Sequence, residues 1–149
     1  RKIVEVSGAS WDMPFDGATL ADRLMEPTRI YCKPVMNVMK KVQIHAMAHI
    51  TGGGLVENVP RVLPAGTQVV IHKDAWRRPA IFDWLQKEGG VADDEMLRVF
   101  NNGIGLVVIV SAEEADAAAK AFEAEGETVY RLGEVVGKAD AAAPGCVVI

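Results

Sequence analysis

The chain has 149 residues, of which 50% are hydrophobic and 24% charged, and its formal net charge is −4. This is enough for one globular domain with a sizeable core. The negative charge argues against a general nucleic-acid binder, because phosphate backbones require a basic surface. No apolar run approaches the roughly 18–20 residues that cross a bilayer, so we expect no membrane partner.

The chain has two cysteines, Cys32 and Cys146, and no CxxC pair. A cysteine-based zinc or dithiol site is therefore not expected. Two free thiols fit a reducing cytosol, and we expect a cytoplasmic location. The opening RKIVEV lacks an initiator Met and has the pattern of the middle of an amphipathic segment. We therefore expect residues 1–149 to be a single domain from a longer polypeptide.

The first half of the chain predicts one helix and one strand before a glycine run. Residues 7–27 are rich in Gly, Asp, Ser and Pro and predict a loop or short turns. A helix is predicted over 29–41, with Pro34 causing a kink or a late start. Alternation over 43–50 predicts a strand that ends at the glycines. A helical turn is predicted over 55–59.

The middle of the chain predicts two strands and two helices. A short strand is expected over 67–71, and a helix over 80–87 that Gly89 and Gly90 stop. Asp93 and Asp94 are expected to cap a helix that ends at Phe100. The continuous apolar run IGLVVIV, residues 104–110, predicts a strand buried on both faces.

The last third predicts a helix followed by two strands. Ser111–Glu114 reads as a capping box that opens a helix ending at Glu125. Residues 128–136 predict a strand, 137–145 a linker, and 146–149 an edge strand. Strands and helices alternate, so we predict an α+β or α/β layered fold with one sheet and helices against it.

His45 and His49 lie four residues apart, as in the zinc-binding HExxH pattern. Ala46 stands where that pattern needs its glutamate, and glycines follow at once, so zinc hydrolysis is not expected and no metal site is predicted. We expect His45 to be an ordinary solvent-facing strand residue. His49 lies beside the glycines, where a functional role is favoured.

Thr51, Gly52, Gly53 and Gly54 form neither a Walker A loop nor a GxGxxG motif. The remaining pattern is a strand, a glycine turn and a helix start, whose backbone N–H groups can bind an anion. Thr51 could add a hydroxyl, and Arg61 could reach a phosphate with two N–H groups. The other interpretation is a tight turn without a ligand, and the spacing leaves both open.

The second turn of interest is FNNGIG, residues 100–105. Asn101 and Asn102 tolerate left-handed conformations, so the simpler interpretation is that they form the turn. Ligand hydrogen bonding is the alternative. Trp76, Phe82 and Trp84 are interpreted as core or helix-packing residues.

Five blocks in order closely resemble the C-terminal domain of aminoimidazole ribonucleotide synthetase, also called phosphoribosylformylglycinamidine cyclo-ligase. They are PTRIY (27–31), HAMAHITGGGLVENVPRVLP (45–64), IFDWLQ (81–86), EMLRVFNNGIG (95–105) and GETVYRLGE (126–134). The resemblance covers nearly the whole chain. It implies a mixed sheet with flanking helices, in agreement with the layered fold predicted from the elements.

The resemblance implies a ligase of purine biosynthesis that uses ATP and Mg2+ to close the imidazole ring of formylglycinamidine ribonucleotide. ATP and Mg2+ would be bound mainly by an N-terminal domain, which would also form a homodimer. The C-terminal domain, residues 1–149, would close a cleft over the substrate. We therefore expect residues 1–149 alone to be inactive.

The resemblance also implies site residues. His49 is the expected catalytic residue. The expected substrate-binding residues are Thr51, Gly52, Gly53, Gly54, Asn58, Arg61, Asn101 and Gly103. Asn102 stands where the family commonly has Cys, which weakens any catalytic role for that position. The alternatives are a stand-alone anion-binding domain, or a relative of the formylglycinamidine ribonucleotide synthetase, thiamine monophosphate kinase or selenophosphate synthetase type.

Overall fold

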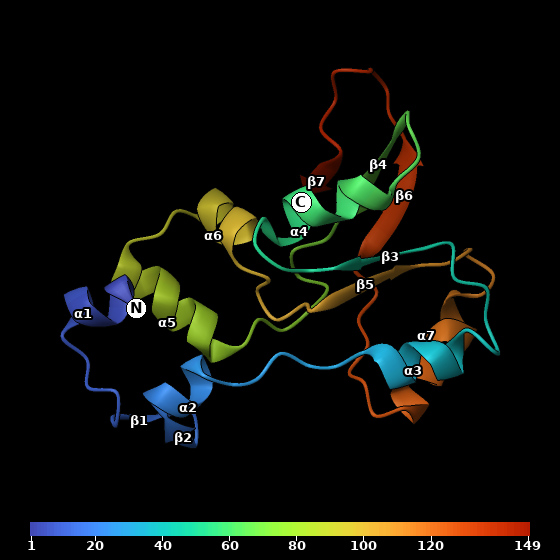
Figure 1. The fold of residues 1–149 in the computed structure, drawn as a ribbon. Coiled ribbons are helices and arrows are strands. Elements are labelled where there is room, and N and C mark those ends of the chain that lie inside the picture. Colours follow the sequence, from blue (N-terminus) through green and yellow to red (C-terminus); the bar gives the residue numbers. More distant parts are fainter.

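The computed structural model describes all residues from 1 to 149, and its strands lie in three small sheets (Figure 1). The helices are α1 (Lys2–Ser7), α2 (Leu20–Leu24), α3 (Cys32–Val38), α4 (Gly54–Asn58), the 3-10 helix η1 (Val59–Val62), α5 (Ala80–Gly89), α6 (Asp93–Val99) and α7 (Ala115–Ala124). The strands are β1 (Pro14–Phe15), β2 (Ala18–Thr19), β3 (Ala46–His49), β4 (Thr67–Ile71), β5 (Leu106–Ile109), β6 (Gly133–Gly137) and β7 (Cys146–Val148).

The largest sheet is mixed, with β4 at its centre. β6 pairs with β4 antiparallel and β7 pairs with it parallel, so Val69 lies between Val135 and Cys146. β3 and β5 form a separate antiparallel pair in which His49 lies opposite Leu106. The mixed sheet with flanking helices is confirmed. The expectation of one sheet is wrong, because residues 128–132 form no ladder and so do not join β6 to β5.

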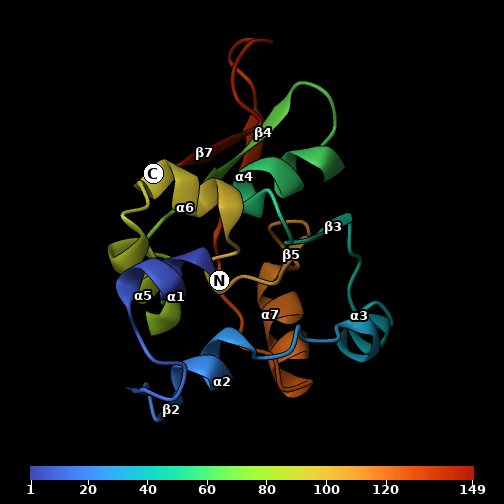
Figure 2. The ribbon, with the colours of Figure 1, turned by 60° about the vertical axis from the view of Figure 1, so that its left-hand side comes forward.

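Two hydrophobic clusters stabilise these layers. The larger cluster lies between the two main sheets and α4, and includes Leu55, Ile71, Trp76 and Ile104. The second joins α3 to α7 through residues such as Val38 and Phe122. Figures 1 and 2 show α3 beside α7 below the β3–β5 pair, whereas the β4 sheet lies at the opposite end. The β3–β5 pair, which leads into the glycine turn, therefore packs against both clusters.

Residues 7–27 contain more regular structure than the loop we expected. Asp16 and Gly17 both have positive φ, 46° and 78°, and link β1 to β2 as a tight hairpin. Thr19 then caps α2 in a reciprocal capping box with Asp22. Both signals are present in the sequence, as an Asp-Gly pair and a Thr-x-x-Asp spacing. In both main views this segment lies at the end away from the β4 sheet (Figure 2).

Four other features differ from the predictions: one helix start, two helix caps and the burial of one strand. The helix predicted from residue 29 begins at Cys32, so Pro34 lies in its first turn, where a missing N–H costs little. The Ser111–Glu114 capping box is wrong, since Glu114 is the N-cap and no side chain caps it. The Asp93–Asp94 cap is also wrong, since Ala92 is the N-cap of α6 and no side chain caps it. β5 is half-buried throughout, not buried on both faces, because only β3 pairs with it.

No helix is long and apolar enough to span a membrane.

Candidate functional site

The glycine turn follows directly from the end of β3. His49 is the last residue of this strand, and its side chain is exposed. The Gly54 N–H donates to the Thr51 carbonyl oxygen (3.0 Å), which closes the turn. Gly53 and Gly54 have φ of 99° and 55°, a region that residues with a Cβ rarely adopt. The turn thus presents His49 and Thr51 to solvent from a backbone that requires glycine.

The three glycines have different surroundings. A Cβ on Gly54 would lie 2.0 Å from the Leu97 carbonyl oxygen and 2.8 Å from that of Phe100, so α4 begins in close contact with the end of α6. A Cβ on Gly52 would meet nothing within 4 Å. Gly54 therefore serves helix packing, whereas Gly52 is open to a ligand.

The Asn58 side chain holds the turn from behind. Only 6% of this residue is exposed. Its Nδ2 donates to the carbonyl oxygens of Thr51 (3.4 Å), Gly52 (3.2 Å) and Gly54 (2.8 Å), and its Oδ1 accepts from Arg61 (3.1 Å). The structure therefore gives Asn58 internal partners and places it beneath the turn, where it positions the backbone.

Charges of both signs lie beside the turn. The exposed Arg61 guanidinium is 3.6 Å from Glu57 Oε2, and the same oxygen would be 2.7 Å from a Cβ on Gly53. A carboxylate at this place opposes an anion over Gly53, and Arg61 partly offsets it. The face at Gly52 has no such carboxylate against it, since a Cβ there would meet nothing within 4 Å.

In the second turn, residues 100–105, Asn101 and Gly103 both have contacts within the protein. Asn101 Oδ1 accepts the Gly103 N–H (3.0 Å), and Gly103, with φ of 96°, lies where a Cβ would be 2.4 Å from Pro79 Cδ. Asn101 and Gly103 thus have structural partners, while Gly103 itself stays exposed.

Asn102 joins the two turns. It is 1% exposed, and its Nδ2 donates to the carbonyl oxygens of Met96 (2.7 Å) and Phe100 (3.1 Å). Its own carbonyl oxygen accepts the Trp76 indole N–H (2.9 Å). The Phe100 carbonyl is also the group against which Gly54 packs. The Asn102 amide nitrogen thus holds the turn from within, while its buried Oδ1 has no hydrogen-bond partner.

Tyr31 is a member of this region that the residue-by-residue reasoning missed. Its ring lies edge-on to that of His49, with centroids 6.0 Å apart and planes at 71°. Burial is the main cause of its raised pKa; Glu127 adds to the rise and Arg29 opposes it. The only sequence signal was the PTRIY block of the resemblance. An aromatic residue so far along the chain from His49 offers no local pattern that would reveal the contact.

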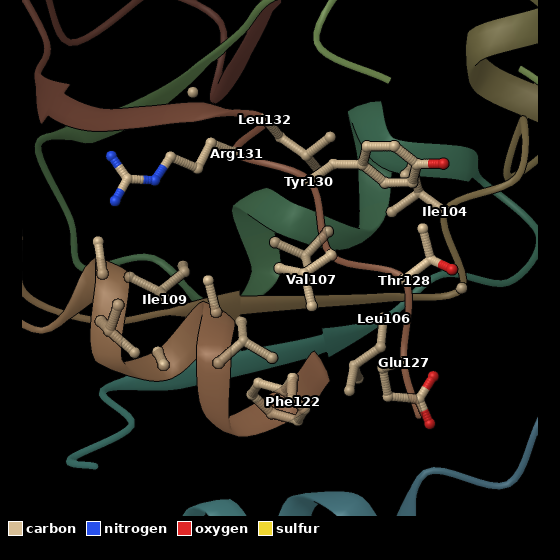
Figure 3. Close-up of a pocket in the computed structure, with 18 of the residues that line it drawn as sticks. Ile104, Leu106, Val107, Ile109, Phe122, Glu127, Thr128, Tyr130, Arg131 and Leu132 are labelled. Atoms are coloured by element: carbon tan, nitrogen blue, oxygen red, sulfur yellow. The ribbon is translucent and has the colours of Figure 1, made fainter. Parts of the chain in front are cut away.

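A groove of about 770 Å³ lies beside β5 and contains no residue of β3, the strand that pairs with β5. Figure 3 shows β5 and α7 on one side and residues 127–132 on the other, with Val107, Ile109 and Phe122 between them. Glu127, Thr128 and Tyr130 lie along the same segment. None of the expected catalytic or binding residues except Gly103 lines this groove. The groove is mainly apolar and contains no residue of the glycine turn, although Arg29 and Tyr31 are among its lining residues.

Metal ligands are not gathered anywhere in residues 1–149: no three His, Cys, Asp or Glu side chains are placed to hold an ion.

Comparisons with known proteins identify consistent relatives. Residues 1–143 match the family model described as AIR synthase related protein, C-terminal domain. The chain is 51% identical over 148 residues to phosphoribosylformylglycinamidine cyclo-ligase of Cupriavidus pinatubonensis, covering 99% of this chain and 42% of that protein. It is 56% identical over 135 residues to the protein of the same name from Paraburkholderia phymatum, covering 91% and 38%.

The fold is also similar to a solved structure, the crystal structure of hydrogenase maturation protein HypE. The TM-score is 0.63 at 20% identity, covering 98% of this chain and 44% of that chain. This likeness concerns the fold alone. In each comparison the chain spans about two fifths of the matched protein.

Proposed function

Because this chain belongs to the family of AIR synthase related proteins, C-terminal domain, we propose that it is the C-terminal part of a phosphoribosylformylglycinamidine cyclo-ligase. The proposed reaction is the ATP-dependent ring closure of formylglycinamidine ribonucleotide to aminoimidazole ribonucleotide. The observation that carries this proposal is the 51% identity to a cyclo-ligase over nearly the whole chain. The proposed location is the cytoplasm, and the proposed assembly is a homodimer.

The residues present do not form a magnesium site, because no three potential ligands are gathered in the chain. No recognised nucleotide-binding glycine motif occurs either. We therefore place ATP and Mg2+ mainly on the N-terminal part of the relatives, which this chain does not span, and we assign no step through them to these residues.

The chain's own contribution is to bind and orient the substrate. His49 is exposed at the end of β3, which pairs with β5, and lies beside the open Gly52. We assign its imidazole to the reacting end of the substrate. Thr51, Gly52 and Arg61 form the surface for a phosphate or the reacting amide, with Gly53, Gly54 and Asn58 shaping the turn beneath. A preorganised backbone of this kind lowers the barrier mainly by positioning.

Asn101 and Gly103 belong to the second edge of this proposed site. Gly103 is exposed, and Asn102 fixes the turn to the Phe100 carbonyl against which Gly54 packs. The two turns are therefore mechanically connected.

The test is a chimera. The segment of the Cupriavidus pinatubonensis cyclo-ligase that precedes the matched region is joined to residues 1–149 and assayed for aminoimidazole ribonucleotide formation. We expect ATP-dependent turnover by the chimera and none by residues 1–149 alone. A folded chimera that binds ATP but produces no ring-closed product, beside an active parent enzyme, would contradict the proposal.

A further inference from the structure

The segment leading into α3 is attached to the rest of the domain at two points. Met25 and Ile30 are 75% and 80% exposed, so this connection has little core of its own. Arg29 Nε lies 2.7 Å from Glu127 Oε2, and its NH2 group donates to the Gly126 carbonyl oxygen (2.9 Å). Arg29 thus fastens the segment to the end of α7, far away in sequence.

Tyr31 is the second attachment point, and it lies against the strand pair that carries His49. A Cβ on Gly105 would be 2.0 Å from the Tyr31 hydroxyl oxygen, so the phenol occupies space that only a glycine leaves free. The Gly105 carbonyl oxygen accepts the Ile50 N–H (2.9 Å). The backbone under the phenol is therefore tied to the residue next to His49.

The contact with His49 follows from this arrangement. The edge-on geometry, with centroids 6.0 Å apart, is a favoured arrangement of two aromatic rings. His49 is otherwise exposed, and no side-chain hydrogen bond orients its imidazole. Tyr31 is thus the one aromatic neighbour that limits the directions this imidazole can take.

We infer that Tyr31 is a positioning residue that orients the His49 imidazole towards the substrate, and that the Arg29–Glu127 ion pair keeps Tyr31 in place. This inference rests on the proposed function for its effect on catalysis. Its structural part, the orientation of one ring by the other, is independent of the reaction.

The first readout is the NMR signal of the His49 ring in residues 1–149, with His45 as the internal reference. We expect Tyr31→Leu to shift the His49 ring signals while those of His45 stay in place. Tyr31→Phe retains an aromatic edge and should leave His49 close to its wild-type shift. Arg29→Gln, at an exposed side chain, should shift His49 in the same direction as Tyr31→Leu but less. Unchanged His49 signals in both Tyr31→Leu and Arg29→Gln would overturn the inference.

The second readout is the kinetics of the active chimera. We expect Tyr31→Leu to lower kcat about tenfold with KM nearly unchanged, and Tyr31→Phe to retain most of the activity. Equal losses in Tyr31→Phe and Tyr31→Leu would overturn the positioning role, because the hydroxyl would then be needed directly. If the wild-type chimera has no cyclo-ligase activity while the His49 signals still respond to Tyr31→Leu, the proposed function fails and the ring contact stands.

Discussion

Gly54 lies so close to Leu97 that a Cβ built on it would be 2.0 Å from the Leu97 carbonyl oxygen. This contact brings the start of α4 against the end of α6, and thereby brings the glycine turn next to the turn at residues 100–105. The Phe100 carbonyl oxygen completes the junction, because Gly54 packs on it and Asn102 donates to it. The proposed site is thus built on a helix contact that only glycine permits.

Replacing Gly54 with alanine should destabilise the domain strongly. The new Cβ would overlap a backbone carbonyl, which cannot rotate away, and φ is 55°. We expect the free energy of unfolding to fall by about 3 kcal/mol in urea titrations followed by circular dichroism. Gly52→Ala is the matched control, since its Cβ meets open space, and should change stability by about 0.5 kcal/mol or less. Equal effects of the two variants would contradict the packing argument.

Asn58→Ala should loosen the turn. The amide N–H groups that serve the carbonyl oxygens of Thr51, Gly52 and Gly54 would be lost, leaving partly buried acceptors without a donor. We expect a loss of about 2 kcal/mol in stability. Faster hydrogen exchange of the Gly54 N–H in NMR should accompany it. A variant with unchanged stability and an unchanged exchange rate would show that the turn keeps its conformation without the Asn58 side chain.

His49→Ala in the active chimera should affect turnover much more than stability. His49 is exposed, so its removal leaves no cavity, whereas the proposed site loses its only imidazole. His45→Ala is the matched control, because His45 is also exposed and lies just before the same strand. We expect kcat/KM to fall by much more than threefold for His49→Ala and not for His45→Ala. A threefold change corresponds to about 0.7 kcal/mol of transition-state stabilisation. Activity within that range would remove His49 from the mechanism.

Glu57→Gln should strengthen phosphate binding at the glycine turn. The Glu57 carboxylate lies beside Gly53 and pairs with Arg61. Its neutral analogue removes the repulsion between this carboxylate and a bound anion, and leaves the Arg61 guanidinium free to pair with the anion. We expect the dissociation constant for inorganic phosphate, titrated by NMR at the Gly52 and Gly53 amides, to fall severalfold. Glu95→Gln provides a control of equal charge change, because Glu95 pairs with Arg98 instead. Identical responses, or no binding by either, would argue against an anion at this turn.

Because the Cys146 thiol is buried, we predict that the folded domain loses stability at alkaline pH. Burial raises its pKa from 9.0 to about 11. The unfolded chain therefore releases this proton at a lower pH than the folded chain does, and the folded state loses stability as pH rises from 9.0 to about 11. Each pKa unit corresponds to about 1.4 kcal/mol, and solvent screening of the partly buried thiol reduces the effect, so we expect a loss of up to about 2 kcal/mol.

This prediction is checked by urea titrations between pH 8 and 11 on the wild type and on Cys146→Ala, which should lack that part of the slope. Thiol labelling of the folded wild type should modify the exposed Cys32 first. Parallel pH slopes in the two proteins would contradict the assignment.

Several elements were predictable because their cause is local. The strand at 67–71 matches β4 residue for residue, and the helix from residue 80 ends in a left-handed Gly90, as its Gly-Gly pair indicates. The turn at Gly52–Gly54 was also visible, since three glycines after a strand predict a sharp reversal. Alternation, turn residues and glycine runs act over a few residues and can be read without the fold.

The sheet pairing and the environment of each site residue were decided by the tertiary structure. The apolar run 104–110 predicts full burial, but its burial depends on whether residues 128–132 pair with it, and they do not. Likewise, the sequence does not reveal that the Asn58 amide donates into the turn. Long-range pairing and the direction of a side chain depend on distant residues, so short patterns do not encode them.

The order of residues is enough to reveal the family resemblance, the glycine turn and the residue types available for chemistry. That Gly54 is a packing residue, that Gly52 is the open position and that Tyr31 lies against His49 becomes clear only in the folded domain. Residue identity sets which contacts are possible, whereas the packing of α4 on α6 and of residues 29–31 on the β3–β5 pair sets which are made.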